Sequence, residues 1–158
     1  MNIVFFEKPG CAGNAKQKAL LSVAGHRVEA RNLLTYPFTP PELLSYFGKK
    51  PVTEWFNRSA PRVKSRAVRP EALSPDVALE MLLCEPTLIR RPLMDIRGKR
   101  CVGFDLDFIE AYAGPLPREE RVDALRAQVV DGCSGHSMDH RCPDSNASSE
   151  VNNAADRS

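Results

Sequence analysis

Apolar and polar positions in the first part of the chain predict a strand, a helix and a second strand. Residues 3–6 form a short apolar run that ends before Pro9-Gly10, as a buried strand does. Residues 14–24 are rich in good helix formers, and Gly25 supplies a stop signal. One face of this helix collects three apolar residues: Ala15, Ala19 and Val23. Residues 27–33 alternate weakly, so the three elements predict a βαβ unit with parallel strands.

The middle of the chain predicts a series of short helices. Thr39-Pro40-Pro41-Glu42 combines a capping residue, first-turn prolines and a capping-box glutamate, so a helix is expected to begin there. A second helix is expected near residues 52–56. Ser74-Pro75-Asp76 opens a third helix. Its apolar stripe has three members: Leu79, Leu82 and Leu83.

The pattern then returns to strands. Residues 87–90 are a short strand candidate that runs into Arg91-Pro92. Residues 93–96 and 100–103 flank a tight turn and predict a hairpin, and residues 105–112 predict a helix. The order β-α-β, helices, β-β-α is the thioredoxin-like plan. The expected fold class is therefore α/β, with a four-stranded mixed sheet, flanking helices and a helical insertion.

Length and composition divide the chain into one domain and a polar end. The 158 residues are enough for one domain, which we place at residues 1–114. Residues 115–130 predict a further amphipathic helix. Residues 131–158 contain almost no large apolar side chain, so burial cannot offset the entropy of ordering them. This last segment is expected to be a disordered tail.

Charge and hydropathy exclude several classes of function. The formal net charge is only +2, which gives no whole-protein attraction to nucleic acid or to an anionic membrane. The sequence has no apolar run of about 18 residues that would predict a membrane-spanning helix. Its N-terminal apolar run is too short for a signal peptide. We therefore expect a cytoplasmic protein with reduced thiols that binds neither nucleic acid nor membranes. The five cysteines are odd in number and widely spaced, unlike a disulfide framework.

Cys11 is the leading candidate for chemistry. It follows the first predicted strand and immediately precedes the first helix, so unpaired N–H groups and the helix dipole face its thiol. Both favour the thiolate, and the same donors can hold an oxyanion or a mixed disulfide. Gly10 and Gly13 permit close approach of a ligand. The alternative interpretation is that Cys11 merely fills a turn.

Arg91-Pro92 at the entry to the hairpin is the second feature. Thioredoxin folds place a cis-proline at this point, facing the thiol, and the alternative is an ordinary trans proline. The third feature is a basic run that contains no acidic residue. Its cations could bind an anionic substrate, the thiolate or an acidic partner, or they could form a solvated surface. The run consists of Arg58, Arg62, Lys64, Arg66 and Arg69.

Together these segments resemble the ArsC/Spx family, and within it the nitrogenase-associated proteins of nitrogen-fixing bacteria. The resemblance covers residues 2–112. It is carried by residues 5–11, 54–58, 60–65, 88–92 and the pattern Gly98…Val102-Gly103. It implies a thioredoxin-fold accessory factor with a redox or assembly role in nitrogen fixation. One alternative is a glutathione- or glutaredoxin-dependent arsenate (oxyanion) reductase, and a second is a non-catalytic module that binds a partner through residues 58–69.

The resemblance implies roles for individual residues. Cys11 matches the nucleophile of arsenate reductases, and Arg91 matches an arginine that holds the oxyanion. Arg58 is a candidate for a second such arginine, and Pro92 is the cis-proline candidate. The expected anion- or substrate-binding set also contains two residues of the loop after the thiol: Gly13 and Asn14.

Four positions depart from the arsenate reductase pattern. Phe104 stands where a third arginine is expected, Glu7 where a histidine is usual, and Asn14-Ala15 where Ser-Arg is usual. The carboxylate of Glu7 opposes formation of a nearby thiolate. Each lost charge-assisted contact removes roughly 1.5–3 kcal/mol from the binding free energy of the oxyanion. These departures therefore weaken the expected oxyanion site.

Two-thiol and single-thiol redox mechanisms differ in whether they need a second cysteine near Cys11. Position 14 is asparagine, so the Cys-x-x-Cys switch of Spx regulators is absent. A two-thiol mechanism would need Cys84 or Cys101, and both are expected to be buried core thiols. A single-thiol mechanism needs only Cys11, with glutathione as co-substrate and no resident cofactor. The expected partners are glutathione or glutaredoxin, or a nitrogenase-related protein.

The predicted tail carries four weak candidates for metal ligands: Cys133, His136, His140 and Cys142. Their span is short, the last two are separated by one residue, and no apolar shell surrounds them. We therefore expect no metal site and favour a disordered tail.

Overall fold

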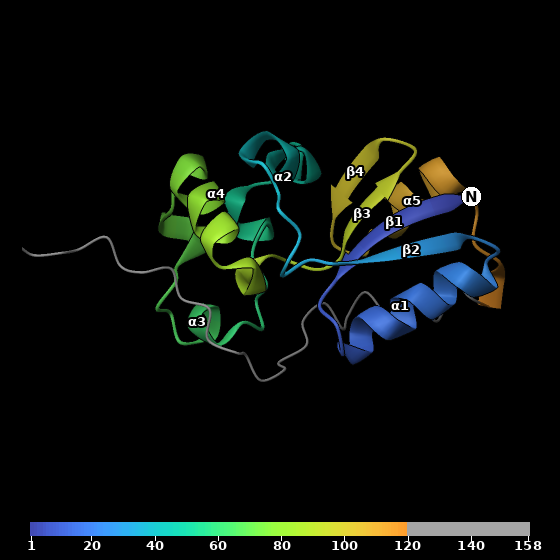
Figure 1. Ribbon diagram of the computed structural model, residues 1–158, viewed down its shortest axis with the longest axis horizontal. Helices are drawn as coiled ribbons and strands as arrows, with labels where there is room; N and C mark the ends of the chain where they lie inside the picture. Colours follow the sequence, from blue (N-terminus) through green and yellow to red (C-terminus); the bar gives the residue numbers. More distant parts are fainter. Residues whose placement is uncertain (120–158) are drawn as a thin grey trace, which may run out of the picture.

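The protein contains a four-stranded mixed sheet with the strand order β2-β1-β3-β4, and the helical insertion lies beside it (Figure 1). The computed structural model describes residues 1–119. The helix expected over 115–130 extends beyond this range, and the tail expected over 131–158 lies outside it. The strands are β1 (Asn2–Glu7), β2 (Arg27–Asn32), β3 (Leu93–Ile96) and β4 (Lys99–Val102). The helices are α1 (Ala12–Val23), α2 (Pro40–Phe47), α3 (Pro61–Lys64), α4 (Pro75–Cys84) and α5 (Leu106–Ala113).

Strand directions follow from the connections. A crossover through α1 makes β1 and β2 parallel, whereas β3 is antiparallel to both β1 and β4. The β3–β4 turn is a tight one, with φ of 56° at Arg97 and 81° at Gly98. Asp95 accepts a hydrogen bond from the Gly98 N–H at 2.7 Å, which fixes the turn. The predicted α/β class, with a four-stranded mixed sheet, flanking helices and a helical insertion, is confirmed.

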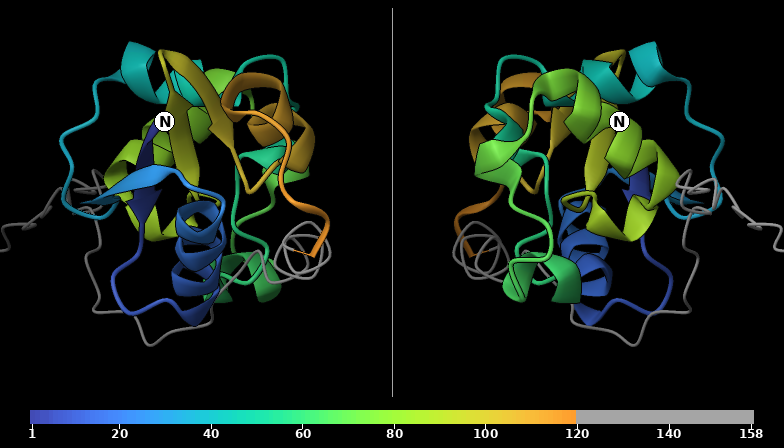
Figure 2. Two further views of the ribbon diagram at one scale, coloured as in Figure 1. Left: turned by 90° about the vertical axis from the view of Figure 1, so that its right-hand side faces the viewer. Right: turned by 90° about the vertical axis from the view of Figure 1, so that its left-hand side faces the viewer.

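Alternating residues of β1 pack into two apolar clusters on opposite faces of the sheet. Ile3 and Phe5 pack with side chains of α1 and α5. Phe6 packs in the other cluster with Leu43 of α2 and Leu82 of α4. Both views in Figure 2 place α1 (blue) and α2 (cyan) on opposite sides of the strands. The insertion and the sheet therefore share one of the two cores.

The buried face of α1 differs from the expected one. Ala15, Ala19 and Val23 are all exposed. The buried residues are instead Gly13, Asn14, Gln17 and Leu21. Alanine methyls offer little area to bury. The amides of Asn14 and Gln17 can be buried because they bond to each other, with Asn14 Nδ2 donating to Gln17 Oε1 at 3.0 Å.

The insertion begins at its predicted caps. Thr39 accepts a hydrogen bond from the Glu42 N–H, and Ser74 accepts one from the Val77 N–H. The helix expected near residues 52–56 is instead a single 3₁₀ turn (η1, Val52–Glu54). It is followed by Trp55, whose ring stacks on Phe47 at 4.5 Å between centroids. Two further 3₁₀ turns, η2 (Pro70–Ala72) and η3 (Pro86–Leu88), complete the insertion.

The strand expected over residues 87–90 is also shorter than predicted. The turn η3 occupies its first half, and strand pairing is limited to a bridge between Phe56 and Ile89. Prolines at the starts of these segments favour turns over long strands.

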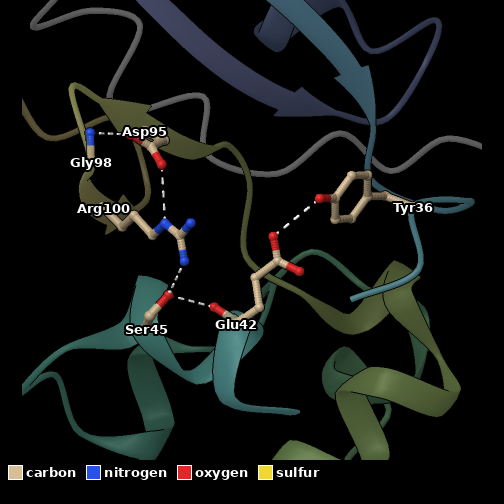
Figure 3. Close-up of polar contacts among 6 residues, drawn as sticks. All are labelled: Tyr36, Glu42, Ser45, Asp95, Gly98 and Arg100. Atoms are coloured by element: carbon tan, nitrogen blue, oxygen red, sulfur yellow. Dashed lines mark hydrogen bonds and ion pairs between the residues drawn. The ribbon is translucent and has the colours of Figure 1, made fainter. Parts of the chain in front are cut away.

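A polar network ties α2 to the β3–β4 hairpin (Figure 3). Arg100 Nε donates to Asp95 at 3.0 Å, and its Nη1 donates to the Ser45 hydroxyl of α2 at 2.8 Å. The Arg100 guanidinium also lies 5.1 Å from the ring centroid of Tyr46. On the other side of α2, the Tyr36 hydroxyl donates to Glu42 at 3.1 Å. The network holds the insertion in a fixed position over the sheet.

Candidate functional site

Cys11 lies in the loop that leaves the carboxyl end of β1 and enters α1. It is the N-cap residue of α1, with extended backbone angles, and its N–H donates to the Lys8 carbonyl at 3.1 Å. Gly10 turns the chain just before it with φ of 79°. The cysteine is 8% exposed, so the loop shields most of it. The Cys11 side chain accepts no capping hydrogen bond from the helix N–H groups, but it is largely desolvated at the positive end of the helix dipole.

The Asn14 side chain anchors this loop through hydrogen bonds. Its Oδ1 accepts a hydrogen bond from the Lys8 N–H at 3.4 Å, while its Nδ2 donates to Gln17. Asn14 is 3% exposed, and neighbouring Gly13 is buried as well. Asn14 therefore holds the loop that carries Cys11. Contact of Gly13 and Asn14 with a bound anion stays a prediction.

Glu7 is neutralised by a partner from α1. Lys18 Nζ lies 2.8 Å from its carboxylate. The sequence suggested that Glu7 opposes a thiolate at Cys11. Because an ion pair offsets the charge, this opposition is smaller than the sequence alone indicates.

Arg91 and Pro92 reach the same edge of the sheet as Cys11. In the antiparallel pairing of β1 with β3, Phe6 lies opposite Leu93, so the residues before Leu93 lie beside the carboxyl end of β1. The Arg91–Pro92 peptide bond is cis, the isomer that the family resemblance implies. Both residues are buried, and Arg91 is 5% exposed. The Gly103 N–H, just after β4, donates to the Pro92 carbonyl at 2.8 Å. The end of β4 therefore meets Cys11, Arg91 and Pro92 at one corner of the sheet.

A second guanidinium at this corner, that of Arg90, was missed by the sequence reasoning. A Cβ placed on Gly103 would lie 3.0 Å from Cζ, Nε and Nη2 of Arg90, so the guanidinium packs against the bare backbone of Gly103. The Arg90 N–H donates to the Trp55 carbonyl at 2.8 Å. The doubled arginine in Arg90-Arg91-Pro92 was a signal that could have drawn attention to it. Phe104, the next residue, is 2% exposed and packs in the core.

Arg58 follows a segment that runs away from this corner. The Asn57 N–H donates to the Leu88 carbonyl, and Phe56 pairs with Ile89 in antiparallel fashion. The chain after Asn57 therefore leaves in the direction opposite to that in which residues 90–92 approach the sheet. Arg58 itself is exposed. Its expected contact with an anion stays a prediction.

Acidic residues outside the basic run neutralise much of its charge. Arg62 pairs with Glu85, and Arg66 and Arg69 both lie near Glu71. These partners come from outside residues 58–69. The observed pairing favours a solvated surface over a dedicated docking site.

The two other described cysteines occupy different environments. Cys84, at the end of α4, is exposed and disulfide-bonded, so the expectation that it is a core thiol is wrong. Cys101 is 5% exposed and packs among Met94, Phe104 and other apolar residues. Burial first, and then the charge of Asp105, raises the pKa of the Cys101 thiol above its ordinary value. Cys101 is therefore a structural thiol.

The tail cluster of Cys133, His136, His140 and Cys142 lies outside the described residues. Within residues 1–119, His, Cys, Asp and Glu side chains do not gather in threes as a metal site would need. No helix in the same range is long and apolar enough to cross a membrane.

Chemically, this corner can support a nucleophilic thiol. A sulfur at the amino end of a twelve-residue helix is placed to carry negative charge. Two consecutive arginines, Arg90 and Arg91, bring positive charge to the adjoining segment. The described residues offer no second thiol with the same placement.

Comparison with other proteins identifies relatives along most of the chain. An uncharacterized 15.7 kDa protein in the draG 3′ region of Rhodospirillum rubrum is 42% identical over 141 residues, which are 89% of this chain and 94% of that protein. The global transcriptional regulator Spx of Streptococcus agalactiae is 27% identical over 130 residues, 81% of this chain and 93% of the regulator. No protein-family model matches the chain.

Solved structures share the fold at low sequence identity. A protein from Bacteroides fragilis described as ArsC-family related has a TM-score of 0.61 at 22% identity and covers 71% of this chain and 99% of its own. Arsenate reductase from Vibrio cholerae has a TM-score of 0.56 at 22% identity, with coverage of 72% and 96%. At this identity the likeness concerns the fold.

Proposed function

Because this chain belongs to the ArsC/Spx family of thioredoxin-like proteins, we propose that it is a single-thiol redox protein that supports nitrogen fixation. The observation that carries the proposal is the position of Cys11. Its sulfur lies at the amino end of α1, on the sheet edge that also holds Arg91 and Pro92. The proposed compartment is the cytoplasm, where thiols are kept reduced.

The proposed reaction is thiol–disulfide exchange. The Cys11 thiolate attacks one sulfur of a disulfide ligand, the S–S bond breaks, and the other sulfur leaves as a thiolate that takes up a proton. The product is a mixed disulfide on Cys11. A glutathione thiolate then attacks the ligand sulfur that is bonded to Cys11, forms a new disulfide with it and releases the Cys11 thiolate. Each cycle consumes one glutathione thiol and releases one thiol from the disulfide ligand, so the number of disulfide bonds is unchanged.

The role in nitrogen fixation, in redox or assembly support, rests on relatives. The segments around residues 5–11, 54–65 and 88–92 resemble nitrogenase-associated proteins. In addition, the 42% identical protein comes from Rhodospirillum rubrum, a nitrogen-fixing bacterium. A nitrogenase-related protein is thus the proposed partner in the cell.

Reduction of arsenate or a related oxyanion is the second candidate function. The buried guanidinium of Arg91 favours it, since a buried cation at the edge of a thiol site suits an anion. Phe104 argues against efficient arsenate turnover. It is an apolar core residue at the position where the family resemblance implies a third arginine.

The test of the proposed function compares the full-length protein with Cys11→Ser and Cys101→Ser. We expect glutathione disulfide to modify Cys11 selectively, as read by peptide mass spectrometry. Cys11→Ser should abolish this modification and Cys101→Ser should leave it intact, because Cys101 is buried in the core. A Cys11 that reacts no faster than an unstructured cysteine would refute the redox proposal.

Two further measurements separate the candidate functions. A nitrogen-fixing host that lacks the gene should grow poorly on dinitrogen, and the wild-type gene but not Cys11→Ser should restore growth. Consumption of arsenate by purified protein with glutathione and glutaredoxin would instead favour the oxyanion reductase. Normal growth without the gene would contradict the role in nitrogen fixation.

A further inference from the structure

Strand β2 forms one edge of the sheet (Figure 1). Among the described residues it pairs with β1 on one side and with no strand on the other. Its backbone N–H and C=O groups point alternately toward β1 and away from it. The Arg27 N–H donates to the Met1 carbonyl at 2.8 Å. The Leu33 N–H donates to the Glu7 carbonyl at the same distance. Three residues between them therefore turn their backbone groups outward: Val28, Ala30 and Asn32.

The middle of this edge is the part that a new strand can reach. Ala30 is exposed, and Val28 and Asn32 are partly exposed. The Asn32 carbonyl already accepts a hydrogen bond from the Tyr36 N–H at 3.1 Å, because the chain turns back at this end of the strand. A pairing strand must therefore be centred near Ala30. An exposed strand edge is a template for pairing unless its side chains oppose it.

Glu29 and Arg31 carry opposite charges on one face of β2. They are two positions apart in a strand, so their side chains point to the same side of the sheet. Arg31 Nη2 lies 2.7 Å from Glu29 Oε1. The Arg31 guanidinium also lies 5.7 Å from the ring centroid of Phe6, which holds it beside the strand. This face therefore presents one anion and one cation on either side of Ala30.

A second copy of β2, running antiparallel, matches both the backbone groups and the charges when Ala30 lies opposite Ala30. The two Ala30 residues then exchange two hydrogen bonds, and each Asn32 N–H meets the Val28 carbonyl of the other copy. Glu29 of each copy lies opposite Arg31 of the other, in non-hydrogen-bonded pairs whose side chains are closest.

The charges also select this register over its neighbours. A slip of two residues places Glu29 opposite Glu29 or Arg31 opposite Arg31, and like charges directly opposite each other destabilise a strand pair. A slip of one residue would turn half of the outward hydrogen-bonding groups away from their partners.

We propose that the β2 edge is a self-association surface, on which two copies of this chain pair their β2 strands antiparallel about Ala30 into one continuous sheet. The interface is two-fold symmetric and uses the same edge of both copies, so it closes at a dimer. It is built from one six-residue strand of each copy, so the dimer is weak and reversible. The inference is independent of the chemistry proposed for Cys11.

The experiment measures self-association of the full-length protein by sedimentation equilibrium over a range of concentrations. A reductant is present throughout, so no disulfide between chains contributes. We expect a monomer–dimer equilibrium. Amide hydrogen exchange in a peptide that covers residues 27–33 should slow as the concentration rises, because the Ala30 N–H is hydrogen-bonded only in the dimer.

Two charge variants test the register. Glu29→Arg brings arginines opposite each other, and Arg31→Glu does the same with glutamates. Each should weaken the dimer by about ten- to thirtyfold, since two attractive pairs become repulsive. A mixture of the two variants should associate, because their charges are complementary. The double variant Glu29→Arg/Arg31→Glu should dimerise like the wild type. The matched control is Lys99→Glu, an equal change of charge at an exposed residue of β4, the other edge strand.

Ala30→Pro tests the backbone pairing. It removes an outward N–H and no hydrogen bond to β1, and proline is tolerated on edge strands when its nitrogen faces solvent. The variant should keep the circular dichroism spectrum of the wild type and lose the dimer. Should Ala30→Pro fail to fold, the charge variants still decide the question.

The proposal is refuted if the wild type stays monomeric up to about 1 mM, the dissociation constant of a very weak complex. It is also wrong if Ala30→Pro or both single charge variants leave a dimer intact, since another surface would then be responsible. Failure of the two charge variants to associate when mixed would overturn the antiparallel register. None of these results bears on the redox proposal for Cys11.

Discussion

Replacement of Leu82 tests whether the insertion and the sheet form one folding unit. Leu82 of α4 is fully buried and shares a cluster with Phe6 of β1 and Leu88 of η3. Leu→Ala at buried sites lowers the free energy of unfolding by about 2–5 kcal/mol, and more where the surroundings cannot close around the cavity. Residues from both the sheet and the insertion surround Leu82, so we expect Leu82→Ala to cost about 3 kcal/mol.

The assay is urea denaturation followed by two probes on opposite faces of the sheet. Trp55 is the single tryptophan of the chain and reports by fluorescence on the core shared with the insertion. Pulsed alkylation of Cys101 reports on the core beneath α1 and α5. Both midpoints should fall together in Leu82→Ala, since a small domain unfolds as one unit.

The control for this variant lies on the same helix. Val77 is 49% exposed, so Val77→Ala should change the free energy of unfolding by no more than about 0.5 kcal/mol. A lower urea midpoint at Trp55 with an unchanged midpoint at Cys101 would show that the insertion unfolds separately. A change below about 1 kcal/mol in Leu82→Ala would show that the site is not packed as described.

Two further predictions concern the sheet. Arg100→Met removes the contacts to Asp95 and Ser45 and should lower the free energy of unfolding by about 0.5–1.5 kcal/mol in urea titrations, whereas Lys99→Met, an exposed neighbour, should not. Burial raises the pKa of the Cys101 thiol above its ordinary value of 9.0, so the folded protein keeps a proton that the unfolded chain loses. The resulting stability is fully present below about pH 9 and declines above it by up to about 1.4 kcal/mol per pH unit. Cys101→Ala should abolish this part of the pH dependence in unfolding measured from roughly pH 8 to 10.5, and identical slopes in both proteins would contradict the assignment.

Local signals in the sequence were sufficient for the order of the elements. The caps at Thr39 and Ser74, the stop at Gly25 and the turn at Gly98 depend on residues within a few positions of one another. Such interactions involve only neighbouring residues, so the sequence itself carries their signal. The same holds for the position of Cys11 before α1, which follows from the end of one element and the start of the next.

Local signals failed where packing against the rest of the domain decides which side chains are buried or paired. The sequence favoured Ala15, Ala19 and Val23 as one face of α1, but the structure buries Asn14 and Gln17, whose amides satisfy each other. The basic run contains no acid, but Glu71 stands just after it in the sequence, and folding brings Glu85 to Arg62. The sequence also gave no sign of the partner of Glu7, Lys18.

The sequence alone determined which elements form and that Cys11 lies between a strand and a helix. Interactions between neighbouring residues govern both features. Only the tertiary structure decided which charges surround that thiol. Arg91 and Pro92 are some eighty positions from Cys11 and reach its edge of the sheet through the antiparallel pairing of β1 with β3. Arg90 packs beside Gly103, the residue just after β4, which leaves room for its guanidinium. Strand pairing sets these neighbours, and pairing depends on the packing of the whole domain.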